Sequence, residues 1–218
     1  MQPVIALFDL VSARDSSPLP LGRNQRLFLA AFGVLCAIVF AAVWGLAVSA
    51  TTAPAALANA VKVPMLLVVS GAVSLPAVLL CWKLTAAEGA PALDLLAAYA
   101  VAVFGGTLVL AALSPLVALY AHSSGFAGPY VALGSAVIGL VAGAALFRRA
   151  LGRLLPPGAP RRSVALPVAL MLVVQLATLS QLASVVSPVF AHRTVFGRGI
   201  DALDRHGAEA EPQEAEPR

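Results

Sequence analysis

The sequence predicts an all-α fold, a polytopic bundle of about five transmembrane helices with short interfacial helices at its ends. Hydrophobic residues make up 60% of the 218 residues and charged residues only 11%, and the mean hydropathy is +0.92. These values lie far from the balance of a soluble domain. The apolar residues also form long runs separated by short segments rich in proline or arginine. Because a bundle of this size leaves no room for a sizeable soluble domain, we expect function to reside in the bundle, its loops or its tails.

An N-terminal tail, residues 1–26, precedes the first span. Apolar side chains within residues 4–11 cluster on one helical face, which favours a short interfacial helix; a frayed tail is the alternative. The first span is predicted at residues 27–50. The apolar region of a secretory signal has only about 7 to 15 residues, so we interpret this longer run as an uncleaved span.

The second span is predicted at residues 64–82, between Lys62 and Lys83. These 19 residues carry no charge, and at about 1.5 Å each they measure roughly 28 Å, the thickness of a bilayer's hydrocarbon layer. Pro64 suits a first helical position, whereas Pro76 removes an internal hydrogen bond and predicts a kink. Alternatively, residues 51–63 extend the helix outward and Pro64 becomes a second kink.

The third span is predicted at residues 93–120. It is longer than a bilayer requires, so it must tilt, bend at Pro115 or protrude. Asp94 falls in its first turn, where a carboxylate complements the helix dipole. Gly105 and Gly106 lie in the middle of the span and predict a close helix contact.

The fourth span is predicted at residues 130–147 and ends at a basic segment. Ser135, Gly139 and Gly143 are spaced by four, which lets another helix approach closely, so they predict a helix-packing face. Five arginines follow the span and are first a topology signal, with headgroup binding or docking of an acidic protein as the alternative. They are Arg148, Arg149, Arg153, Arg161 and Arg162.

The fifth span is predicted at residues 164–189 and is the most polar. Gln175, Thr178 and Gln181 cannot all face lipid without cost, so we expect them to turn toward other helices or toward water, where they would line a polar path. Residues 190–207 mix apolar residues with arginine and are interpreted as interfacial. Residues 208–218 are acidic and contain proline, which predicts disorder.

Orientation follows from the distribution of Lys and Arg. With five spans and the N-terminus inside, nine Lys and Arg residues lie inside and five outside. The positive-inside rule therefore predicts a cytoplasmic N-terminus. An even number of membrane elements would move the C-terminal tail inside, and this alternative stays open. The predicted location is the bacterial cytoplasmic (inner) membrane.

Short motifs mark several of these spans. The second begins with Ala60-x-Lys62-x-Pro64 and contains Pro76, Ser114-Pro115 lies near the end of the third, and Gln181 or Gln175 precedes Pro188 in the last. With these motifs, residues 27–200 resemble a family of small multi-pass bacterial inner-membrane proteins of unknown function, reminiscent in layout of Yip-type membrane proteins. That family has Arg-Pro-Phe after the last span, whereas this chain has Ser187-Pro188-Val189-Phe190. The resemblance implies a multi-pass bundle and no particular activity.

The sequence offers few groups for chemistry. Apart from Asp94 at a boundary, the predicted spans contain no ionisable residue of the kind that ion-coupled transporters use. His122 stands beside Ser123, but adjacent loop residues rarely form a catalytic pair. His122, His192 and His206 lack the spacing of metal ligands. We therefore predict no catalytic, cofactor-binding or metal-binding residues and no cofactor.

These observations predict a non-enzymatic integral membrane protein that acts as a scaffold, an anchor or a subunit of a membrane complex. The expected partners are the lipid bilayer and other membrane proteins or further copies of the chain, and no nucleic acid. A small transporter or channel subunit with a polar path along the last span is the alternative. An intramembrane hydrolase is a third and weaker hypothesis.

Overall fold

The described part of the chain is an all-α bundle, which confirms the predicted fold class. A computed structural model describes residues 23–49, 53–85, 92–124, 126–154 and 162–185, with only the backbone of Arg162 and of residues 181–185. It contains five helices and no strand within these ranges. They are α2 (Arg23–Val48), α3 (Ala53–Thr85), α4 (Ala92–Ser123), α5 (Ala127–Leu154) and α6 (Arg162–Val185). All five are long and apolar enough to cross a membrane.

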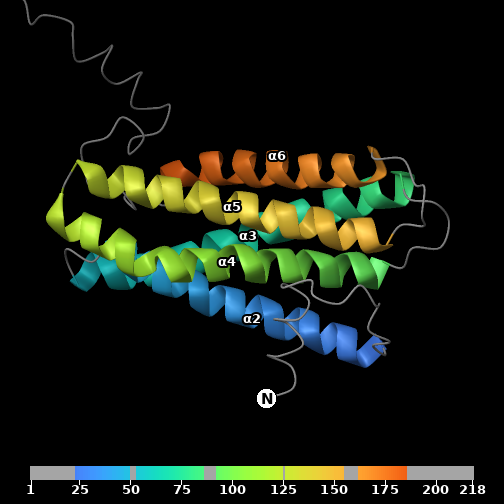
Figure 1. Cartoon of the computed structure of the whole chain (residues 1–218), viewed down its shortest axis with the longest axis horizontal. Helices are drawn as coiled ribbons and strands as arrows, with labels where there is room; N and C mark the ends of the chain where they lie inside the picture. The colour runs from blue at the N-terminus through green and yellow to red at the C-terminus, as the bar shows by residue number, and fades with distance from the viewer. Residues whose placement is uncertain (1–22, 50–52, 86–91, 125, 155–161, 186–218) are drawn as a thin grey trace, which may run out of the picture.

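The helices run alternately in opposite directions around α4 (Figure 1). Helix α4 packs mainly against α2 on one side and α5 on the other. Helix α3 passes along the bundle from α2 to α6: its Asn59 lies against Gly45 of α2, and its Val78 lies in the same buried cluster as Met171 of α6. Helix α4 is also the most buried of the five. The bundle is therefore organised around α4, with α6 on its outside.

Helix α3 starts earlier than the predicted span. It begins at Ala53 rather than Pro64, so residues 53–63 extend the helix outward, which was the alternative left open by the sequence. Alanine is the strongest helix former, and neighbouring helices make proline tolerable inside a membrane helix. Pro64 is consequently an internal residue and is buried. Pro76 and Pro115 also lie inside helices, on their exposed sides, and the kinks expected at all three stay predictions.

The contact between α4 and α5 brings two backbones together through glycine. A Cβ atom added to Gly106 would lie 2.8 Å from the carbonyl oxygen of Gly139, and one added to Gly143 would lie 3.1 Å from the carbonyl oxygen of Ala102. No side chain fits between the helices at this point. Small residues at these positions are thus required for α4 and α5 to approach this closely.

Three apolar clusters fill the rest of the interior. The largest joins four helices near one end of the bundle, with Trp82 of α3, Leu95 of α4, Phe147 of α5 and Met171 of α6 all buried. Another joins Trp44 of α2 to α4 and α5 toward the opposite end. The third lies between α2 and α4. Outside these clusters, large apolar side chains face outward from every helix, as expected of a bundle solvated by lipid.

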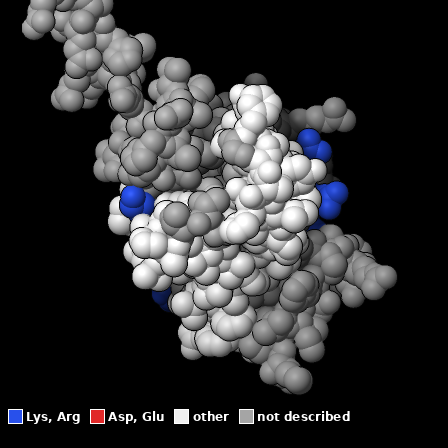
Figure 2. Space-filling view, turned by 90° about the vertical axis from the view of Figure 1, so that its left-hand side faces the viewer, with Lys and Arg blue, Asp and Glu red and all other residues white. Residues whose placement is uncertain are grey.

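The two ends of the bundle differ in charge. Figure 2 looks onto the end where α4 finishes and α5 begins, and the described surface there is almost entirely uncharged, with Lys and Arg at its margins. The opposite end holds the beginning of α2 with Arg23, the end of α3 with Lys83, and the end of α5 with three arginines. We call this the basic end. The predicted N-terminal and C-terminal interfacial helices and the acidic tail lie outside the described residues.

Replacement of Gly106 by alanine is expected to weaken the α4–α5 contact. The added methyl would meet backbone, which cannot rotate away, so the helices must separate; overpacking of this kind costs about 1–3 kcal/mol. Thermal unfolding of purified protein followed by circular dichroism would show a lower Tm. Gly134→Ala is the matched control, because a Cβ at Gly134 meets nothing within 4 Å. Equal Tm values for the two variants would contradict the proposed role of Gly106.

Candidate functional site

The hydroxyl of Tyr99 links three helices inside the bundle. Tyr99 extends from α4, and its Oη lies 2.6 Å from Oγ of Ser74 on α3. The side-chain amide of Gln175 on α6 donates from Nε2 to the same Oη at 3.0 Å. All three residues are buried. We call this set, which ties three helices together, the tyrosine node.

Each hydrogen bond of the tyrosine node can be assigned a donor and an acceptor. An amide nitrogen only donates, so Oη of Tyr99 accepts from Gln175 and has its own proton left for Ser74. Ser74 in turn donates to the carbonyl oxygen of Gly71 in its own helix, at 3.3 Å. The donors therefore run from α6 through α4 to α3. Each hydroxyl has a partner, as buried polar groups require.

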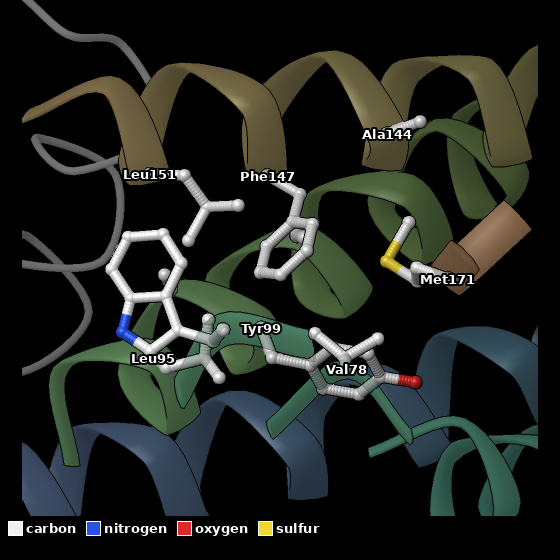
Figure 3. Close-up of a cluster of buried hydrophobic side chains, with 10 residues drawn as sticks. Val78, Leu95, Tyr99, Ala144, Phe147, Leu151 and Met171 are labelled. Atoms are coloured by element: carbon white, nitrogen blue, oxygen red, sulfur yellow. The ribbon is translucent and has the colours of Figure 1, made fainter. Parts of the chain in front are cut away.

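The surroundings of the tyrosine node are apolar. The ring of Phe147 meets the Tyr99 ring edge to face, with centroids 5.9 Å apart and planes at 87°. Figure 3 shows Phe147 and Leu151 pointing from α5 toward Tyr99 and Leu95 of α4, with Met171 and Val78 nearby. In such a medium an unpaired hydroxyl would be costly, so the node favours one arrangement of α3, α4 and α6.

The residues predicted to form a polar path have different roles. Gln175 is buried against Tyr99 and serves helix contact. Thr178 is half-buried, and its Oγ1 donates to the carbonyl oxygen of Val174 within α6 at 2.7 Å. The side chain of Gln181 lies outside the described residues. The two described members thus form hydrogen bonds with protein groups.

The predicted packing residues of α5 lie buried along one face. Gly139 and Gly143 meet α4, as described above. Ser135 lies one turn earlier, where its Oγ accepts a hydrogen bond from Nε1 of Trp44 on α2 at 2.9 Å and donates to the carbonyl oxygen of Ala132 at 2.7 Å. One face of α5 therefore contacts α4 and, through Ser135, reaches α2.

Two further polar contacts fix α2. Arg26 at its start forms an ion pair with Asp94 at the start of α4, and both side chains are partly buried. At its other end, the buried amide of Asn59 on α3 donates to Oγ of Ser49, which follows α2. The predicted capping position of Asp94 is thus combined with an interhelical contact that the sequence did not suggest.

The predicted docking arginines lie at the basic end. Arg148, Arg149 and Arg153 are exposed on the last turns of α5. Arg161 and the side chain of Arg162 lie outside the described residues. Asp94 is the only acidic residue within the described ranges, and it is paired with Arg26. The described segments therefore offer no further acidic side chain to pair with the three described arginines of α5.

The histidine and the two serines lie where α4 ends and the chain turns into α5. His122 and Ser123 are exposed at the end of α4. Oγ of Ser124 accepts the backbone N–H of Ala127 at 3.0 Å, which caps α5. Among the described residues no three His, Cys, Asp or Glu side chains are grouped so that they could hold a metal ion. These residues therefore end one helix and begin the next.

No protein-family model, no curated protein and no solved structure matches the chain. The resemblance to small bacterial inner-membrane proteins therefore stays a prediction.

The hydrogen-bond partners of the interior polar residues were not predicted from the sequence, and some of these residues were not singled out either. Ser74 and Tyr99 are single polar residues in apolar runs and were not singled out, although each lies where a hydroxyl must find a partner. Trp44 is similar, because its indole N–H requires an acceptor when buried. A search for isolated polar atoms in each span would have found these residues. It could not have paired them, since pairing depends on which helices are neighbours.

Replacement of Tyr99 by phenylalanine is expected to destabilise the bundle. It removes the hydroxyl while keeping the ring against Phe147, and leaves Ser74 and Gln175 without their shared partner, a loss of about 0.5–2 kcal/mol. Unfolding in mixed micelles would measure it. Tyr130→Phe is the control, since Tyr130 is 65% exposed. A stability of Tyr99→Phe equal to that of the parent would show that the node contributes nothing.

Proposed function

We propose that the protein is a non-enzymatic integral membrane component that acts as a scaffold, an anchor or a subunit of a membrane complex. The observation that carries the proposal is the use of the interior polar side chains. Several of them join helix to helix, at the tyrosine node, at Trp44–Ser135 and at Arg26–Asp94. Interhelical bonds at several heights of the bundle keep the exposed faces of its helices in fixed positions. A protein that binds other membrane components requires such fixed surfaces.

The outer surfaces supply the second part of the proposal. Helix α2 presents large apolar side chains on one face, and Leu35 and Val39 are 58% and 53% exposed. Such a face can contact lipid or another membrane helix, because both are apolar. We further propose that the chain resides in a bacterial cytoplasmic membrane with the basic end inside, which is supported by the excess of Lys and Arg at that end.

Site-directed photo-crosslinking in native membranes tests the scaffold role. A photoreactive amino acid at Leu35 or Val39, one turn apart on α2, is expected to capture the same protein, because neighbouring positions face one partner. Leu80, 63% exposed on α3, serves as the position on a different helix. Only lipid adducts at all three positions, together with a monomer by light scattering, would overturn the proposal.

Reporter fusions test the orientation. With the basic end inside, alkaline phosphatase fused after Ser124 is expected to be active, and the same enzyme fused after Leu154 is expected to be inactive, because it folds only outside the cytoplasm. A green fluorescent reporter at these two sites should give the opposite pattern. Activity after Leu154 and none after Ser124 would reverse the assigned orientation.

A further inference from the structure

We propose that the exposed face of α5 binds an anionic phospholipid, with its phosphate at Arg148, Arg149 and Gly152. The inference goes beyond the scaffold role and does not depend on it. It starts from the order of residues along that face. Tyr130, an apolar segment and the arginines follow one another from one end of the helix to the other.

The length of this face matches a membrane. Tyr130 is 65% exposed and its ring contacts Phe126, with centroids 5.2 Å apart, at the uncharged end of the bundle. Exposed aromatic residues are typical of the level of the headgroups. Arg149 follows 19 residues later, at roughly 28 Å along the helix. The arginines therefore lie at the opposite headgroup level, where phosphates are found.

The apolar segment between these levels is continuous on the surface. Leu133, Val137, Ile138 and Val141 are all more than half exposed. Acyl chains reach about 15 Å, half of the hydrocarbon layer, so a lipid whose chains lie against Ile138 and Val141 would place its headgroup beside the end of α5. This continuity favours a lipid over an acidic soluble protein, which has nothing to place along the apolar segment.

The end of the segment offers room for a phosphate. Gly152 lies three and four residues after Arg149 and Arg148, on the same side of the helix, and a Cβ added to it would meet nothing within 4 Å. A headgroup can therefore approach the backbone between the two guanidinium groups. Guanidinium binds phosphate oxygens with paired hydrogen bonds, and Arg153 in the last turn adds a third positive charge.

The basic end as a whole also attracts anionic lipid, so the experiment must separate a site from bulk charge. Two variants remove the site in different ways. Arg148→Gln with Arg149→Gln removes two charges, and Gly152→Leu fills the open space without changing charge. Each has a matched control. Arg23→Gln with Lys83→Gln removes two exposed charges from the same end. Gly134→Leu fills an equally open position of α5 in the opposite half of the membrane, roughly 27 Å along the helix from Gly152 and beyond the reach of the same lipid.

Native mass spectrometry of the purified full chain, titrated with phosphatidylglycerol or phosphatidylcholine, measures the bound lipid. The parent is expected to retain phosphatidylglycerol in preference to phosphatidylcholine. The arginine pair variant is expected to lower phosphatidylglycerol affinity about tenfold, because charge-assisted hydrogen bonds are lost, and Gly152→Leu several-fold. Both controls should stay within about twofold of the parent, on the additivity expected for distant sites. All variants replace exposed residues, and a helical spectrum and an unchanged elution volume confirm their fold.

Four outcomes overturn the inference. Equal losses in the arginine pair and in its control would show bulk attraction alone. Unchanged binding by Gly152→Leu would show that the phosphate does not lie there. Equal retention of phosphatidylcholine by the parent would show that the face does not select an anionic headgroup. Glycerol phosphate added as a competitor should not displace the lipid at millimolar concentration, because it lacks the acyl chains; displacement would reassign the site to a soluble phosphate.

Discussion

The bundle depends on the close approach of α4 and α5. Hydrocarbon does not drive apolar helices together, because lipid is as apolar as the side chains it would replace. Contact must then come from good packing, and packing is best where backbones meet. Gly106, Gly139 and Gly143 make this possible over about one turn of each helix. Helix α4, once fixed against α5, becomes the central element against which α2 packs, and α3 joins the bundle mainly through α2 and α6.

Polar side chains fix the register of the packed helices. Glycine contacts alone allow one helix to slide along another, whereas a hydrogen bond between defined atoms sets a register. Trp44 and Ser135 set α2 against α5, and the tyrosine node sets α3 and α6 against α4. Each bond is worth little, about 0.6 kcal/mol on average in a membrane. Their value lies in excluding other arrangements of similar packing quality.

The fold class could be predicted from the sequence because long apolar runs identify helices that can span a membrane. The packing face of α5 could be predicted too, because Ser135, Gly139 and Gly143 are small residues spaced by four, and Gly106 could be predicted as a contact because it lies in the middle of a span. The start of α3 was not, because Pro64 is compatible both with a first turn and with the interior of a supported helix. Partners such as Arg26 for Asp94 were inaccessible for a different reason. The two residues lie 68 positions apart in sequence, and hydropathy carries no information on which helices are neighbours.

The position of Gln175 in the last helix has a consequence for synthesis. Chains enter a membrane from the N-terminus onward, so α3 and α4 are present before α6 is made. Ser74 and Tyr99 can already pair with each other at that stage, and the intermediate of four helices carries no orphaned hydroxyl at this point. When α6 arrives, Gln175 adds one donor to an oxygen that can still accept. The final helix thus docks onto a prepared acceptor, and no earlier bond has to break for the bundle to close.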